Sequence, residues 1–138
     1  MATKFPYYNP EIWGGMECTI NRVDNFFRDQ LLETGHYQRK NDIDKIATLG
    51  FSKIRYPLLW ERHQPHQHAV VDWRWETHQL GELQKHQITP IAGLVHHGSG
   101  PVFTNLLDED FSGKLAHYAG LVARNSRGSN TIRPSMSL

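Results

Sequence analysis

The stretch ITPIAGLVHHGSGP (88–101) decides the fold, because an unbroken apolar run ends in two adjacent histidines and a Gly-Ser-Gly-Pro turn. Its first eight residues have the length and apolar character of a strand that is buried on both faces. FSKIRYPLLW (51–60) predicts a second such strand, which ends near Pro57. EIWGGMECTI (11–20) predicts a short third strand. Strands of this type are typical of parallel sheets covered by helices.

Helical patterns alternate with these strands. Asn41 can cap a short helix that Gly50 stops, and Asp108 can cap a longer one near the end of the chain. Segment 21–38 predicts a loop with one or two helical turns, and 63–73 predicts a polar loop. The predicted helices are 41–50, 73–87 and 106–124.

The order of elements is strand, helix, strand, helix, strand, helix, which predicts an α/β fold with a parallel sheet. A complete (β/α)8 TIM barrel takes roughly 250 residues, and this chain has 138. We therefore expect about three βα units, the N-terminal part of such a barrel, incomplete in this chain.

Composition excludes several classes of partner. The net charge of +1 gives no electrostatic case for nucleic acid or for an anionic membrane. No apolar run approaches the length of a bilayer span, and the N-terminus lacks the apolar region of a secretory signal. The single cysteine, Cys18, cannot form an internal disulfide. We expect a cytoplasmic protein without cofactor or metal.

Polar residues gather where the predicted strands end. In parallel barrels the chemistry lies at the carboxyl ends of the strands, so these side chains are candidates for one site. The residues at these ends are Glu17, Asn21, Arg55, Trp60, His96 and His97.

Three segments carry a resemblance to a known family: IWGGMECTIN, HYQRKNDIDKIATLGFSKIRYPLLWERHQP and ITPIAGLVHHGSGP. In order and spacing they resemble the N-terminal third of family 1 glycoside hydrolases, which include the β-glucosidases and are built on a (β/α)8 barrel. The resemblance runs over 9–124, so residues 1–124 are expected to form a partial barrel domain. It is nearest to a bacterial branch in which a reductase domain of the dTDP-4-dehydrorhamnose reductase type follows the barrel, and it implies such a downstream domain in the intact gene.

The resemblance implies sugar contacts on the first two strands, and hence a small carbohydrate or glycoside as ligand. Asn21 occupies the place of a glutamine that holds sugar hydroxyls, with its amide on a shorter arm. Arg55 and Trp60 match an arginine and a tryptophan of the second strand. In the family that arginine lies beside the nucleophilic carboxylate and helps to keep it ionised.

The third strand extends the implied sugar site. His96 matches a histidine that hydrogen-bonds the sugar, whereas His97 replaces an aromatic residue that is usual there. Glu17 has no counterpart in the family, and its place near a strand end makes it a candidate sugar contact. An alternative for the two histidines is a capped or solvated pair.

The catalytic carboxylates that the resemblance calls for do not match this sequence. Retaining hydrolysis of an O-glycosidic bond needs two carboxyl groups about 5 Å apart. In the family, one follows the fourth strand in an Asn-Glu-Pro motif and the other lies on the seventh strand. Glu61, Asp108 and Glu109 are not at matching positions. We therefore assign no catalytic residue and expect the chain alone to be inactive.

The last residues, NSRGSNTIRPSMSL (125–138), have no periodicity. In the family the chain would run on as FPWVEYYTPVNEP. Permitted codons for 125–138, read two nucleotides later, give that same peptide. We therefore predict that 125–138 is an aberrant, frameshifted tail and that the missing acid/base is encoded in the neighbouring frame.

Two other functions stay open at this stage. The chain could be a carbohydrate-binding or assembly module whose sheet is completed by a partner chain or a second copy. It could also be a small α/β metal-dependent hydrolase that uses its histidines. His63, His66 and His68 have a spacing that could bind metal, although we expect them in a solvated loop.

Overall fold

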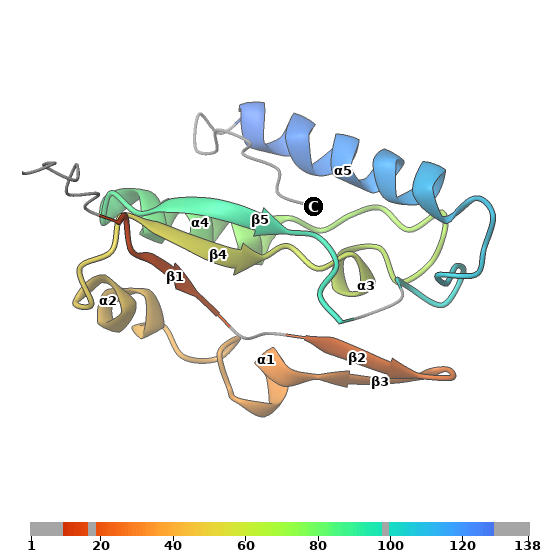
Figure 1. Ribbon diagram of the computed structural model, residues 1–138, viewed down its shortest axis with the longest axis horizontal. Helices are drawn as coiled ribbons and strands as arrows, with labels where there is room; N and C mark the ends of the chain where they lie inside the picture. Colours follow the sequence, from red (N-terminus) through yellow and green to blue (C-terminus); the bar gives the residue numbers. More distant parts are fainter. Residues whose placement is uncertain (1–9, 17–18, 98–99, 129–138) are drawn as a thin grey trace, which may run out of the picture.

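The computed structural model describes residues 10–16, 19–97 and 100–128. Three parallel strands form its main sheet, in the order β1-β4-β5. In the central strand, Arg55 lies between Gly15 on one side and Ile91 on the other. The strands are β1 (Trp13–Gly15), β4 (Lys53–Pro57) and β5 (Thr89–Gly93). The predicted α/β fold with a parallel sheet is confirmed (Figure 1).

Three of the helices fall within or close to the predicted ranges 41–50, 73–87 and 106–124, whereas the short helix over 60–63 was not predicted. The helices are α1 (Gln30–Glu33), α2 (Asp42–Ala47), α3 (Trp60–His63), α4 (Arg74–Lys85) and α5 (Phe111–Gly128). In Figure 1, α4 lies behind β4 and β5, and α5 runs above the sheet. Helix α5 continues past Arg124, where the predicted helix ends. The proposed tail over 125–138 lies partly outside the described residues, which end at 128.

The prediction for 21–38 was wrong in part, because this segment contains a hairpin as well as a helical turn. Strands β2 (Ile20–Val23) and β3 (Phe26–Asp29) pair antiparallel. They are joined by two residues, the first of which, Asp24, has a φ of 53°. Aspartate adopts a positive φ more readily than most other residues, which allows a connection of two residues between the strands. The predicted strand over 11–20 is therefore divided between β1 and the start of β2.

The core lies between one face of the sheet and the helices. Ile54 and Tyr56 of β4 are buried on this face, whereas Arg55, which points to the opposite face, is exposed. The expectation of burial on both faces was wrong for β4, because no second helical layer within the described residues covers the face on which Arg55 lies. The buried core cluster consists of Ile43, Ile54, Tyr56, Leu58, Trp60, Leu80, Leu83, Ile88, Tyr118 and Val122.

The predicted helix caps differ in detail from the structure. Asn41 occupies the N-cap position of α2, but its side chain makes no capping hydrogen bond. Asp108 precedes α5 by a full turn, and its carboxylate instead accepts hydrogen bonds from the Asp110 N–H, the Thr104 hydroxyl and Lys114. Asp108 therefore orders the approach to α5 rather than capping it.

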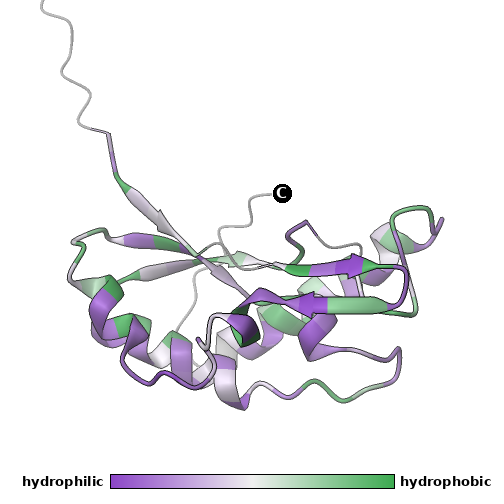
Figure 2. Cartoon of the chain, turned by 90° about the horizontal axis from the view of Figure 1, so that it is seen from below, coloured by the Kyte–Doolittle hydropathy of each residue, from purple (hydrophilic) through white to green (hydrophobic). Residues whose placement is uncertain are grey.

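The helices are amphipathic rather than uniformly apolar. Figure 2 shows polar and apolar bands alternating along them, as expected for helices that pack one side on a sheet. Within the described ranges, no helix is both long enough and apolar enough to cross a membrane.

A buried polar chain joins α2, β4 and α4. His36 is 1% exposed, and its Nδ1 lies 2.8 Å from Asp42 Oδ2. Its Nε2 lies 2.9 Å from the hydroxyl of Tyr56, which also contacts Gln79 Oε1 at 3.4 Å. Both ring nitrogens of the buried histidine are thus satisfied, which a polar group in a core requires.

We expect Tyr56→Phe to lower the free energy of unfolding by about 1–3 kcal/mol, because it leaves buried His36 Nε2 without its partner. Urea unfolding measures the change. A double-mutant cycle with His36→Gln should show that the tyrosine change costs less once the histidine is gone. Strictly additive costs would contradict the coupling.

Candidate functional site

The carboxyl ends of the three parallel strands meet at one edge of the sheet. Met16 follows β1, and its N–H donates to Arg55 O at 3.2 Å. Arg55 and His96 both line a small pocket there, so the structure brings together two of the predicted sugar contacts. The pocket volume is about 20 Å³, which is room for about one water. A whole sugar ring would have to lie at the rim of this pocket.

The other predicted contacts are placed differently. His97 is exposed, has a φ of 54°, and lies with its ring centroid 4.3 Å from that of His96. Asn21 is an exposed residue of β2, where it pairs with Arg28, and it does not line the pocket. Glu17 lies outside the described residues.

Trp60 is a core residue in this structure. Its side chain is 0% exposed, and its ring stacks on Tyr118 with 5.8 Å between centroids. Its Nε1 donates to Gln64 Oε1 at 3.0 Å. Both the ring and its polar edge are therefore occupied within the chain, which leaves no face of Trp60 for a sugar here.

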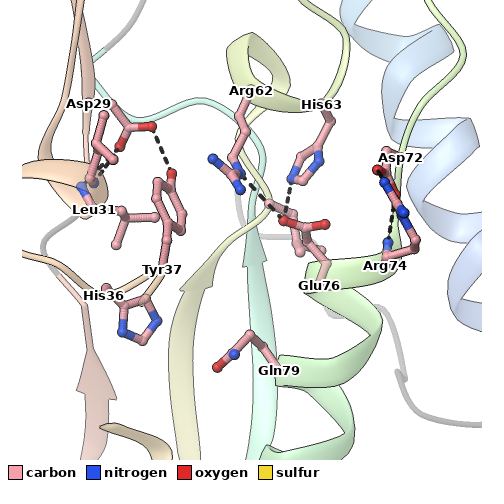
Figure 3. Close-up of polar contacts among 12 residues, drawn as sticks. Asp29, Leu31, His36, Tyr37, Arg62, His63, Asp72, Arg74, Glu76 and Gln79 are labelled. Atoms are coloured by element: carbon pink, nitrogen blue, oxygen red, sulfur yellow. Dashed lines mark hydrogen bonds and ion pairs between the residues drawn. The ribbon is translucent and has the colours of Figure 1, made fainter. Parts of the chain in front are cut away.

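A buried charged cluster on α3 and α4 was missed by the sequence analysis (Figure 3). Glu76 is 1% exposed, and its Oε1 lies 3.3 Å from His63 Nε2 and 3.7 Å from Arg62 Nε. These residues, with Asp72 and Trp75, line a groove of about 400 Å³. His63 is thus buried, so the expectation of a solvated loop was wrong for it, although His66 and His68 are exposed.

Burial shifts the acid–base properties of this cluster. It raises the pKa of Glu76 to about 7. Burial and the nearby Arg62 cation lower the pKa of His63 to about 4, so this histidine is uncharged at neutral pH. Glu76 can therefore gain or lose a proton close to neutral pH, as general acids and bases do.

Arg62 links this cluster to the N-terminal hairpin. Its guanidinium lies 3.7 Å from the ring centroid of Tyr37, a cation–π contact. The Tyr37 hydroxyl donates to Asp29 Oδ2 at 2.8 Å, and Asp29 also caps α1 through the N–H of Leu31. Burial and this hydrogen bond raise the pKa of Tyr37. The cluster is therefore connected, through Arg62 and Tyr37, to β3 and α1, in addition to lining its groove.

Neither a metal site nor a carboxylate in the pocket at the strand ends is found among the residues that the structure describes. Over 10–16, 19–97 and 100–128, no three His, Cys, Asp or Glu side chains gather where they could hold a metal ion. The small pocket at the strand ends is lined by Met16, Arg55, Tyr56, Pro57, Leu59, Gly93 and His96, so none of its described lining residues is a carboxylate.

The fold and this edge define an α/β domain with polar side chains at the carboxyl ends of parallel strands. No protein-family profile matches the chain. It is similar to Beta-glucosidase 1 of Oryza sativa subsp. japonica, at 24% identity over 91 residues. Beta-glucosidase 10 of Arabidopsis thaliana is similar to the same extent. The matches cover 64% of this chain and 18% of each relative, so the chain spans under a fifth of these proteins. The chain is distantly similar to glycoside hydrolases.

Proposed function

We propose that the chain is the N-terminal part of a glycoside hydrolase barrel and contributes sugar-binding groups rather than catalytic carboxylates. The observation that carries this proposal is the meeting of Arg55 and His96 at one pocket where β4 and β5 end. The distant similarity to two β-glucosidases supports it. Hydrolysis of an O-glycosidic bond is then the activity of a longer protein, whose acid/base and nucleophile lie outside these residues.

The expected ligand behaviour follows from the small pocket. A sugar at its rim makes few contacts, so we expect methyl β-D-glucoside to bind with a Kd of roughly millimolar or weaker. We expect His96→Ala to weaken binding by about three- to tenfold, the effect of one lost hydrogen bond. Titration of the ligand followed by NMR measures both values, and p-nitrophenyl β-D-glucoside should show no turnover.

His66→Ala is the matched control, because His66 is exposed in the loop after α3 and does not line the pocket. It should leave the affinity unchanged. Equal affinities in the parent chain and in His96→Ala would contradict the sugar site, and so would hydrolysis by this chain.

The frameshift and the downstream reductase domain belong to the same proposal. Sequencing of the coding DNA through codon 125 and about a thousand bases beyond tests both. A one-base correction that restores FPWVEYYTPVNEP and an open frame with a second carboxylate motif supports the broken hydrolase. An intact frame without these sequences contradicts it.

A second candidate function is an assembly module. Within the described sheet, β1 and β5 each have a neighbour on one side. Apolar Ile12, just before β1, and Trp13, its first residue, are 74% and 55% exposed. Unpaired strand edges are templates for pairing with another chain. Sedimentation that shows a dimer, lost when Trp13 is replaced by lysine, would favour this function.

A further inference from the structure

Arg22 of the hairpin holds the chain segment 100–104, which follows β5. Its Nη1 donates to three backbone carbonyls, Gly100 O at 3.3 Å, Pro101 O at 3.0 Å and Thr104 O at 2.6 Å. Its Nε donates to Asp24 O at 2.7 Å, which fixes the guanidinium against the hairpin turn. The two N–H groups of one nitrogen are thus shared among three loop carbonyls in charge-assisted hydrogen bonds.

Glu61 of α3 holds the same segment from the other side. Its Oε1 accepts the Gly100 N–H at 3.1 Å in a buried environment, and its Oε2 has no hydrogen-bond partner among the residues that the structure describes. Burial raises the pKa of Glu61, while the Gly100 N–H and the Arg22 cation oppose that shift. A half-satisfied buried carboxylate costs stability, so an apolar residue would be the more stable choice if packing were its sole role.

Gly100 itself fits closely between these groups. It has a φ of +85°, and a Cβ there would lie 3.0 Å from Thr104 Cγ2 and 3.3 Å from the Trp60 ring. A side chain would be strained by both the conformation and the contacts. Gly100 is therefore seated at a fixed place on the core.

Residues 58–61 hold the chain on both sides of His96, at 93–94 before it and at Gly100 after it. Leu58 N–H donates to Gly93 O at 2.8 Å, and Trp60 N–H donates to Leu94 O at 2.9 Å. Glu61, the next residue, holds Gly100. His96 is thus two residues from one anchor and four from the other, and short spacings between fixed points limit the conformations open to a chain.

We infer that Glu61 and Arg22 are positioning residues, a latch that holds segment 100–104 and through it restrains the backbone that carries His96. The inference rests on the proposed sugar-binding function for its consequence, a His96 imidazole that is ordered before the ligand arrives. Such pre-organisation raises affinity by reducing the entropy lost on binding. The latch adds no contact to the sugar itself.

Amide hydrogen exchange at Gly100 tests the latch without any ligand. We expect Glu61→Ala to speed exchange of the Gly100 amide by at least about tenfold, because its acceptor is gone. Glu61→Gln keeps an oxygen acceptor and should stay within about threefold of the parent chain. Arg22→Ala should speed exchange at Gly100 and Thr104. Arg22→Lys should do so less, because the ammonium can still donate to the loop carbonyls but lacks the Nε–H that Asp24 O holds in place.

Glu76→Gln is the matched control, since it changes a second buried glutamate whose ion pairs are with α3 and not with segment 100–104. It should leave Gly100 exchange unchanged. Methyl β-D-glucoside should bind Glu61→Ala about three- to tenfold more weakly than Glu61→Gln. Equal Gly100 exchange in folded Glu61→Ala and Glu61→Gln would overturn the latch, and equal sugar affinity would overturn its positioning role. A parent chain that binds no sugar but shows the predicted exchange overturns the proposed function and leaves the latch supported.

Discussion

Replacing Trp60 by alanine is expected to lower the free energy of unfolding by about 3–5 kcal/mol, a large part of what a small domain has. The side chain is fully buried and stacks on Tyr118, with the ring of Phe103 at its edge. Its removal leaves a cavity at the centre of the core and takes the Nε1–H donor from Gln64 Oε1. Urea unfolding followed by far-ultraviolet circular dichroism measures the loss.

Trp13→Ala is the matched control for this change. Trp13 is 55% exposed at the start of β1, where Lys53 Nζ lies 5.2 Å from its ring centroid. Removing an exposed side chain of this kind should lower the free energy of unfolding by less than about 1 kcal/mol. Similar losses for the two variants would contradict the assignment of Trp60 to the core and would reopen its role as a sugar contact.

The contrast between the two tryptophans shows what a sequence pattern can predict. Strands β4 and β5 and helices α4 and α5 follow from apolar runs and from helical spacing, which are local signals. The surroundings of the Trp60 ring are not set by the local sequence, because they depend on how α5 brings Tyr118 against the start of α3. The contact of Trp60 with Tyr118 therefore could not be read from the sequence around Trp60.

Some features of the candidate site also follow from local sequence signals, whereas others depend on packing between distant segments. Arg55 and His96 could be predicted to meet, because the carboxyl ends of parallel strands share one edge. The hairpin that contains Asn21 has a sequence signal of its own, the turn-forming residues Asp24 and Asn25 between apolar residues. The pairing of His63 with Glu76 had no sequence signal, since it depends on the packing of α3 against α4.

Replacing Glu76 by glutamine is expected to stabilise the chain above neutral pH and to have less effect in mild acid. The pKa of this buried carboxyl is about 7 in the folded chain against an ordinary 4.5, so the folded state binds the proton more tightly. Its contribution to stability is complete below about pH 4.5 and is lost as the pH rises to about 7. Glutamine removes that loss, which amounts to at most about 3 kcal/mol at 1.36 kcal/mol for each pKa unit.

The stability that His63 contributes changes with pH in the opposite direction, so the parent chain has to be compared with Glu76→Gln. The pKa of His63 is about 4 in the folded chain against 6.5, so the stability it contributes is lost as the pH falls from about 6.5 to about 4. In the parent chain the two trends oppose each other over most of this range. In Glu76→Gln the glutamate trend is removed, so stability should rise more steeply with pH between about 4 and 6.5 than it does in the parent chain.

Urea unfolding at half-unit steps from pH 4.5 to 8 measures the difference between the two chains. Arg62 and Asp72 also face Glu76, and their effects on its ionisation are already contained in its pKa of about 7, so they are part of the measured difference. Glu109→Gln, which removes an exposed carboxylate, should follow the parent curve within about 0.5 kcal/mol. Parallel curves for the parent chain and Glu76→Gln would mean that Glu76 ionises as an ordinary surface carboxyl and that the cluster on α3 and α4 is open to water.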